Sequence, residues 1–254
     1  MTHNSIMLDE WTSPAVVRQL ETNEIQVWRL ILTDAAGVRA ECRHILSIDE
    51  QAQADRRLPG RVRDEFVYGR ACLRILLSEN LGTSASYVPI VSTEYGKPHV
   101  SGESALEFNV SHSHGIVLIS LSRQGSVGMD VERMNPLMEV MELAPMVFSS
   151  GAMNRLSSLS TEAEKQYFFY RTWTRKEAVV KADGRGLSLP LTGFDLPDGP
   201  ISNQPVRMSG KLYCLNDIGV GEGYLSALAT ESHNCRISMH DFPVSVFANV
   251  PVKE

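Results

Sequence analysis

Long hydrophobic runs are missing from this chain of 254 residues. No apolar stretch approaches the ~20 residues that a membrane-spanning helix needs. The first residues, MTHNSIMLDEW, have neither the basic region nor the apolar region of a secretion signal. The sequence therefore predicts a protein that has no membrane segment, and we expect a cytoplasmic location.

Cysteine is scarce and scattered. The four cysteines form no CxxC pair and have no spacing typical of a zinc site; they are Cys42, Cys72, Cys214 and Cys235. We expect reduced thiols, and neither a disulfide framework nor bound zinc. The net charge of −6 also argues against a general nucleic-acid-binding protein. Six arginines nevertheless lie in one short stretch: Arg56, Arg57, Arg61, Arg63, Arg70 and Arg74.

The patterns that are present indicate an α+β protein. Each half of the chain combines helical periodicity with several strand-like runs. We predict an N-terminal arm over residues 1–23, an N-terminal α+β half over 24–124 and a C-terminal α+β half over 125–254. A ligand cleft between two such halves is a natural expectation, because small-molecule sites favour domain boundaries.

An acidic strand is predicted over Gly125–Glu132. Because strand side chains alternate between two faces, Asp130 and Glu132 share one face, opposite the apolar residues of the strand. Two neighbouring carboxylates repel each other unless a cation or hydrogen-bond donors offset their charge. An edge strand with a solvated acidic face is the alternative interpretation.

A long helix is predicted over Glu164–Asp183. One stripe of this helix repeats every four residues and changes from aromatic to ionic: Phe169, Trp173, Glu177 and Lys181. A simple Glu177–Lys181 salt bridge on the helix surface would account for the last two. Alternatively, the ionic end of the stripe faces a ligand.

Taken together, Asp130, Glu132 and Glu177 offer three hard oxygen ligands without a thiol or an obvious imidazole partner. Such a set suits Mg²⁺, which keeps several waters and usually bridges to substrate phosphates. Lys181, one turn past Glu177, would then reach a phosphate oxygen or a leaving group. The chemistry implied is phosphoryl transfer.

Three further places carry candidate phosphate contacts. Lys97 lies in a Gly-Lys-Pro turn that holds it in an extended conformation. Ser111 and His112 are either a nucleophile with its base, simple turn-capping residues, or donors to a phosphate. Arg70 shares a helical stripe with Phe66, so it either extends from the core edge towards water or holds an anion.

Four motifs in this order are similar to the 4'-phosphopantetheinyl transferase superfamily, in particular its longer, surfactin-synthetase-activating (Sfp-type) class. The matching stretches are Tyr95-Gly96-Lys97-Pro98, Phe108-Asn109-Val110-Ser111-His112-Ser113, Val127-Gly128-Met129-Asp130-Val131-Glu132, and Trp173-Thr174-Arg175-Lys176-Glu177-Ala178-Val179-Val180-Lys181. Together they extend the resemblance over roughly residues 24–230.

The resemblance implies two pseudo-symmetric α+β halves with the cofactor cleft between them. It also implies that coenzyme A donates its phosphopantetheine arm to a serine of an acyl, peptidyl or aryl carrier protein. Adenosine 3',5'-bisphosphate is the second product. The internal duplication favours a monomer.

The same resemblance assigns roles to single residues. The positions that match Mg²⁺ ligands of the family are Asp130, Glu132 and Glu177. Those that match contacts to the phosphates of coenzyme A are Lys97, Ser111, His112 and Lys181. Arg70 is similar to a family arginine at the nucleotide end. The residues expected to take part in catalysis are Asp130, Glu177 and Lys181.

One position departs from the family pattern. After Phe148-Ser149, some members carry a glutamate proposed to activate the acceptor serine, whereas here that position falls at or near Ala152. The base is therefore Glu177 or a metal-bound water, and we favour Glu177. Carrier proteins are acidic as a class, so the arginines at 56–63 and the apolar residues 146–148 are candidates for docking them.

Two other functions are compatible with parts of the pattern. A non-catalytic regulatory module that binds coenzyme A or a nucleotide would explain the missing glutamate. A metal-dependent phosphodiesterase would use the same acidic residues, but the paired His and Asp ligands of two-metal hydrolases are missing. The sequence leaves open whether the pathway makes fatty acids, polyketides, siderophores or other peptides.

Overall fold

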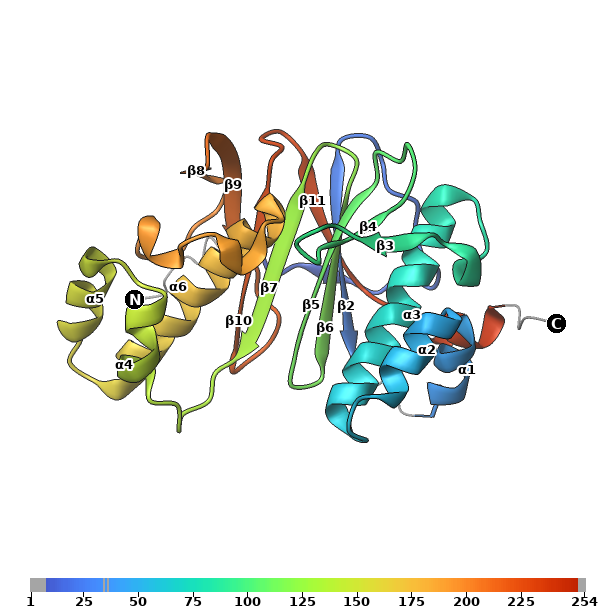
Figure 1. Ribbon diagram of the computed structural model, residues 1–254, viewed down its shortest axis with the longest axis horizontal. Coiled ribbons are helices and arrows are strands. Elements are labelled where there is room, and N and C mark those ends of the chain that lie inside the picture. The colour runs from blue at the N-terminus through green and yellow to red at the C-terminus, as the bar shows by residue number, and fades with distance from the viewer. Residues whose placement is uncertain (1–7, 34, 36, 251–254) are drawn as a thin grey trace. The chain divides into compact units, whose positions relative to one another are not determined.

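The computed structural model describes residues 8–33, 35 and 37–250. These residues form a mixed α and β structure, as the sequence predicted, and they divide into two compact units. Among the residues that the structure describes, unit 1 comprises residues 8–9, 92–97 and 125–234. Unit 2 comprises residues 10–33, 35, 37–91, 98–124 and 235–250. Figure 1 labels the elements of both.

Unit 2 is built on a five-stranded sheet with the order β1-β11-β2-β6-β5. Its strands are β1 (Trp11–Thr12), β2 (Glu24–Ile31), β5 (Glu107–Ser113), β6 (Ile116–Ser122) and β11 (Arg236–Asp241). β11 is parallel to both of its neighbours, whereas β2, β6 and β5 are antiparallel in turn. A short pair, β3 (Ile90–Ser92) and β4 (Pro98–Val100), flanks the turn over residues 93–97.

Three helices belong to unit 2: α1 (Arg39–Ile45), α2 (Ile48–Asp55) and α3 (Arg61–Leu81). Two short 3₁₀ turns, η1 (Ala85–Tyr87) and η5 (Val244–Asn249), complete it. α3 packs on β5 and β6 because its apolar face meets the alternate residues of β6 that point towards it. α3 ends at Gly82, whose φ of 65° suits a left-handed helix cap.

Unit 1 has a four-stranded antiparallel sheet with the order β7-β10-β9-β8. The strands are β7 (Val127–Arg133), β8 (Gln204–Met208), β9 (Lys211–Asp217) and β10 (Tyr224–Thr230). The helices are α4 (Val140–Leu143), α5 (Ser150–Ser157) and α6 (Glu162–Asp183), with 3₁₀ turns η2 (Ala144–Met146), η3 (Gly186–Ser188) and η4 (Leu191–Gly193).

Helix α6 lies along β7 and β10, as Figure 1 shows. It begins at a capping box, in which the Thr161 hydroxyl accepts from the Glu164 N–H and the Glu164 carboxylate accepts from the Thr161 N–H. It ends at Gly184, whose φ is 91°. These caps fix where α6 begins and ends, and Glu177 and Lys181 lie in its last two turns.

At Gly128, β7 packs closely against α6. A Cβ atom added at this position would lie 2.1 Å from the backbone nitrogen of Ala182 and 2.2 Å from the carbonyl oxygen of Ala178. Because both are backbone atoms of one helix, neither moves without displacing α6. The absence of a side chain here allows α6 to contact β7 two residues before Asp130.

Gly128→Ala is expected to destabilise the protein by about 1–3 kcal/mol or more, since overpacking at a rigid contact shifts the backbone. The measurement is the free energy of unfolding from denaturant titration. Gly151→Ala is the matched control, because its added Cβ would lie near side-chain atoms and not backbone: an Asp195 carboxylate oxygen at 3.3 Å and the Ser149 hydroxyl oxygen at 3.6 Å. An unchanged unfolding midpoint for Gly128→Ala would contradict the close contact.

The sequence-based domain ranges are continuous, whereas these units are not, because β11 from the end of the chain pairs with β2. Both divisions have a boundary after residue 124. Residues 1–7 of the predicted arm lie outside the described residues. The domain ranges, the pseudo-symmetry and the ligand cleft stay predictions. Within the described ranges, no helix is both long and apolar enough to cross a membrane.

Candidate active site

The ionic residues of α6 meet the acidic strand β7 in unit 1. The Lys181 ammonium lies 2.6 Å from the Asp130 carboxylate, and both side chains are held away from full solvation, with exposures of 28% and 5%. A charged hydrogen bond in such surroundings is stronger than one on the surface. The predicted strand and the predicted helix therefore bring Asp130 and Lys181 together.

Glu177 lies one turn before Lys181 on the same helix and is half-buried. Burial raises the pKa of its carboxyl, the negative charge of Asp130 raises that pKa further, and Lys181 partly offsets both. The two carboxylates thus repel each other across β7 and α6, and one ammonium compensates them. We call Asp130, Glu177 and Lys181 the acid–lysine cluster.

Glu132 follows Asp130 by two residues on β7, and alternation places it on the same face of the strand. It is partly exposed. Among the residues that the structure describes, no three His, Cys, Asp or Glu side chains converge closely enough to hold a metal ion. The donor chemistry of Asp130 and Glu177 nonetheless fits a hard divalent cation, since both are carboxylates and their mutual repulsion favours positive charge beside them.

Lys97 lies in the same unit as the acid–lysine cluster. Its ammonium is 3.3 Å from the carbonyl oxygen of Val127 and 3.3 Å from that of Ala182. It therefore joins the 92–97 turn to the start of β7 and to the last turn of α6. A cation at this end of a helix is favourable because the carbonyl groups there carry partial negative charge.

A second group of predicted residues lies in unit 2, around a cavity of about 230 Å³. The polar residues that line it are Arg57, Glu65, Arg70 and His112. Burial lowers the pKa of Arg70, and its Nη1 atom is buried without a hydrogen-bond partner in the described part of the chain. An unsatisfied buried guanidinium nitrogen costs free energy that an anion would recover.

Arg57 adds a second positive charge to this cavity. Its guanidinium lies 3.7 Å from the centre of the Phe66 ring, a cation–π contact. The cavity therefore carries two guanidinium groups and an imidazole against one carboxylate, and this balance favours an anionic ligand. Phosphate groups satisfy that description.

The structure does not place every predicted phosphate contact in this cavity. Val110 and His112 line it, whereas Ser111 lies between them on β5 and so points to the other face of the strand. The sequence prediction grouped Ser111 with His112. In unit 2, the structure brings His112 together with Arg70.

Glu65 and Arg57 were absent from the predicted site residues. Glu65 is buried, and its carboxylate contacts the His112 ring and the Gly115 N–H. A signal was available in the sequence, because Glu65 lies next to Phe66 on the helix that carries Arg70. A carboxylate at that position of the helix needs hydrogen-bond donors or a positive charge to compensate it. The sequence pattern does not show which residue of another element supplies them.

Several residues of the arginine-rich stretch have structural roles. Arg74 is buried, bonded to Glu50 and to the carbonyl oxygens of Ala85 and Val88. Arg63 donates to the carbonyl oxygen of Arg57. Arg56 and Arg61 remain exposed.

The three apolar residues proposed for docking a carrier protein differ in their exposure to solvent. Met146 is exposed, whereas Val147 and Phe148 belong to the core of unit 1. Phe148 packs against Phe168 and Phe169. Val147 and Phe148 are therefore unavailable for docking, and Met146 is the member of this stretch that a partner would reach.

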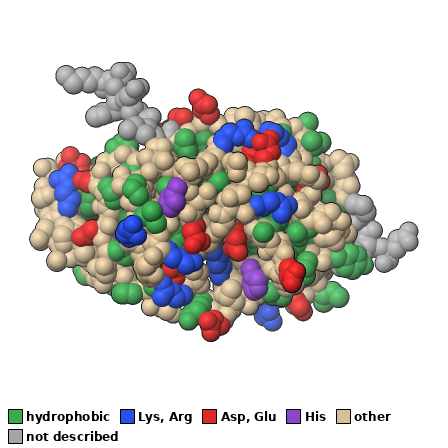
Figure 2. Space-filling view, turned by 90° about the horizontal axis from the view of Figure 1, so that it is seen from above, with side chains coloured by type: hydrophobic (Ala, Val, Ile, Leu, Met, Phe, Trp, Pro, Cys, Tyr) green, Lys and Arg blue, Asp and Glu red, His purple; other side chains and the backbone are tan. Residues whose placement is uncertain are grey.

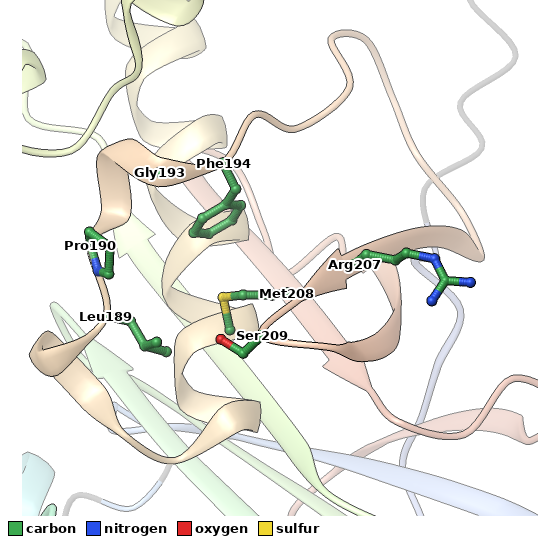
Figure 3. Close-up of a pocket in the computed structure, with 7 residues that line it drawn as sticks. All are labelled: Leu189, Pro190, Gly193, Phe194, Arg207, Met208 and Ser209. Carbon is green, nitrogen blue, oxygen red and sulfur yellow. The ribbon is translucent and has the colours of Figure 1, made fainter.

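Unit 1 contains a second cavity, of about 200 Å³, between the η3–η4 loop and β8 (Figure 3). Leu189, Phe194 and Met208 line it, and the Arg207 side chain points away from the Phe194 ring. No predicted site residue lines this cavity.

Lys176 anchors the loop that borders this second cavity. Its buried ammonium donates to the carbonyl oxygens of Leu191, at 2.6 Å, and Phe194. Burial lowers its pKa to about 8. Lys176 belongs to the fourth sequence motif, and its position shows that part of this motif serves the fold.

The face of the molecule that Figure 2 displays carries charged side chains of both signs. Figure 2 shows acidic and basic side chains interspersed across the face it displays. This arrangement agrees with the modest net charge of −6. The local cationic character of the unit 2 cavity comes from the residues that line it.

The comparison with protein families identifies the class. The model of the 4'-phosphopantetheinyl transferase superfamily matches residues 126–229, which contain β7, α6 and the whole acid–lysine cluster. The matched range thus includes the strand–helix contact at Gly128 and the charged residues that it positions.

Individual relatives carry the same name. The chain is 34% identical over 172 residues to the 4'-phosphopantetheinyl transferase HetI of Nostoc, covering 66% of this chain and 72% of that protein. It is 31% identical over 137 residues to the 4'-phosphopantetheinyl transferase Sfp of Bacillus subtilis, covering 53% and 59%. Against the 4'-phosphopantetheinyl transferase AcpT of Escherichia coli it is 37% identical over 125 residues, covering 49% and 60%.

The chain belongs to the 4'-phosphopantetheinyl transferase superfamily, as the sequence motifs predicted. It is a transferase of that type. Apart from HetI, these alignments span about three fifths of each relative's length.

Proposed function

We propose that this protein transfers the 4'-phosphopantetheine arm of coenzyme A to a serine of an apo acyl, peptidyl or aryl carrier protein. The products are the holo carrier protein and adenosine 3',5'-bisphosphate. The observation that carries the proposal is the acid–lysine cluster, in which the charges of Asp130 and Glu177 repel each other and the Lys181 ammonium pairs with Asp130. All three residues lie within the segment that matches the family.

The reaction breaks a phosphoanhydride bond of coenzyme A and forms a phosphoester bond to the serine. The serine oxygen forms a bond to the phosphorus that carries the pantetheine arm, and the bond from that phosphorus to the bridging pyrophosphate oxygen breaks. The serine proton passes to a base, and the electron pair of the broken bond stays on adenosine bisphosphate. Such a transfer depends mainly on positioning and on stabilising negative charge, rather than on covalent chemistry by the protein.

Glu177 is the base that we propose. Helix α5 contains no carboxylate, and Ala152 only donates its backbone N–H to the Ser149 hydroxyl there. The pKa of Glu177 is raised by burial and by the charge of Asp130. A raised pKa makes a carboxylate a better proton acceptor near neutral pH.

The proposal assigns Mg²⁺ to the carboxylates of Asp130, Glu132 and Glu177. When bound, such an ion offsets the charge that builds on the pyrophosphate oxygens. Lys181 donates to the oxygen that departs, and its ammonium is already held next to Asp130. The phosphates of coenzyme A are assigned to Lys97, Ser111, His112 and Lys181.

The nucleotide end of coenzyme A is assigned to Arg70. Its buried Nη1 atom and the second guanidinium of Arg57 supply the positive charge that a phosphate group needs. A ligand without an acceptor group would leave the Nη1 atom of Arg70 unsatisfied, and two guanidinium groups outnumber the one carboxylate in the cavity, so both features support an anionic donor substrate.

Further parts of the proposal concern the cell. None of the four cysteines forms a disulfide, which suits a cytoplasmic location. A monomeric state belongs to the same proposal. The carrier and its pathway stay open among fatty-acid, polyketide and peptide synthesis.

The test is the mass of a purified apo carrier protein after incubation with this protein, coenzyme A and Mg²⁺. We expect a gain equal to one phosphopantetheine arm, lost when a chelator is present and restored when excess Mg²⁺ is added. No gain with several carriers, combined with retained binding of coenzyme A, would favour the regulatory module. Release of free phosphopantetheine without carrier modification would favour the phosphodiesterase.

A further inference from the structure

Glu65 is a buried carboxylate to which the proposed reaction gives no role. Its side chain is 6% exposed, and it lies on α3 beside the cavity of unit 2. Burying a carboxylate is costly unless charged or hydrogen-bonding groups compensate it. Its contacts therefore indicate what the residue does.

One carboxylate oxygen of Glu65 holds the turn between β5 and β6. Oε1 accepts from the Gly115 N–H at 2.7 Å. The two turn residues both have positive φ, 47° at His114 and 91° at Gly115, as a tight two-residue hairpin requires. Glu65 thus fixes the position of the strand end that carries His112.

The other oxygen faces the imidazole. Oε2 lies 3.2 Å from Nδ1 of His112, whose side chain is 45% exposed. When a carboxylate accepts from one ring nitrogen, it sets the orientation of the ring and determines which nitrogen is presented elsewhere. Because Nδ1 faces Glu65, Nε2 is the nitrogen left for a ligand in the cavity.

We propose that Glu65 is a positioning residue that holds His112 with Nδ1 protonated, so that its Nε2–H donates to a phosphate of coenzyme A. This inference rests on the proposed function. A ring that donates from both nitrogens carries a proton on each, and the Glu65 carboxylate lies where it accepts from Nδ1. Arg57 and Arg70 line the same cavity, and Arg61 lies 3.6 Å from Glu65.

The decisive variant is Glu65→Gln. Its side-chain oxygen still accepts from Gly115, but its amide no longer compensates a protonated imidazole. We expect the affinity for coenzyme A, measured by calorimetry without a carrier, to fall about 10-fold, with kcat and the KM for the carrier within twofold of wild type. Asp64→Asn is the matched control, since Asp64 precedes Glu65 on α3 and pairs instead with Arg39; its affinity should not change.

A double-mutant cycle separates positioning from a general effect on α3. In a His112→Ala background, Glu65→Gln should lower the affinity less than twofold further. A full additional 10-fold loss would overturn the proposal, because Glu65 would then act independently of the imidazole.

A third measurement does not depend on coenzyme A. Nitrogen NMR of the histidine rings in the wild-type protein, with His112 assigned by its loss in His112→Ala, should show a protonated Nδ1 at neutral pH. A bare Nδ1 would overturn the proposal. If Nδ1 is protonated but coenzyme A does not bind to the wild-type protein, the proposed function fails instead, and the Glu65–His112 contact stands.

Discussion

Asp130→Ala is expected to reduce transfer to the carrier protein by about 1,000-fold or more, on the order of the loss seen when one group that stabilises charge is removed from an active site. Asp130 contacts Lys181 and raises the pKa of Glu177, so its removal changes both other members of the acid–lysine cluster. It would also remove a proposed Mg²⁺ ligand. The measurement is kcat/KM with saturating Mg²⁺.

The fold should survive this substitution. Lys181 is partly exposed, so water can hydrate its ammonium once Asp130 is gone. Thermal unfolding checks this expectation. Glu162→Ala is the matched control, since Glu162 is a carboxylate on α6 that pairs with Lys165 and is 75% exposed. If Asp130→Ala keeps wild-type activity with Mg²⁺, the assignment of the metal and of the cluster is wrong.

Lys181→Ala is expected to lower kcat by about 100-fold and the affinity for coenzyme A by only a few-fold. The leaving oxygen carries more negative charge in the transition state than in the bound substrate, so a donor directed at it acts mainly on the rate. Single-turnover kinetics with a saturating carrier separates the rate of the chemical transfer from the rate of product release. Calorimetry supplies the affinity.

Lys165→Ala is the control for charge on the same helix, because its ammonium pairs with Glu162. A loss of affinity equal to the loss of rate in Lys181→Ala would make Lys181 an ordinary binding residue. An effect on thermal stability alone would mean that the Asp130–Lys181 ion pair serves the fold. Either outcome contradicts the role proposed for Lys181 in the transition state.

Much of the secondary structure could be predicted because its determinants are local. The capping box at Thr161 and Glu164 joins residues three positions apart, and the helix then ends at Gly184. The alternation of β7 likewise places Asp130 and Glu132 on one face without reference to any other element. The motif order was enough to predict the family, which the comparisons confirm.

The roles of the arginines on α3 could not be predicted in the same way. Arg70 and Arg74 are one helical turn apart and share a stripe, yet Arg74 is fully engaged by Glu50 and two carbonyl groups. Arg70 keeps a buried nitrogen without a partner in the described structure. The difference arises because Glu50 lies 4.0 Å from the Arg70 guanidinium but bonds directly to that of Arg74.

The sequence by itself determined the caps, the strand faces and the family, because these depend on neighbouring residues or on motif order. Tertiary structure alone decided that Asp130 pairs with Lys181, that Gly128 lets α6 reach β7, and that Glu65 holds His112. Each of these contacts joins residues far apart in the chain. Their distances follow from how a helix packs on a sheet, and no local pattern encodes that packing.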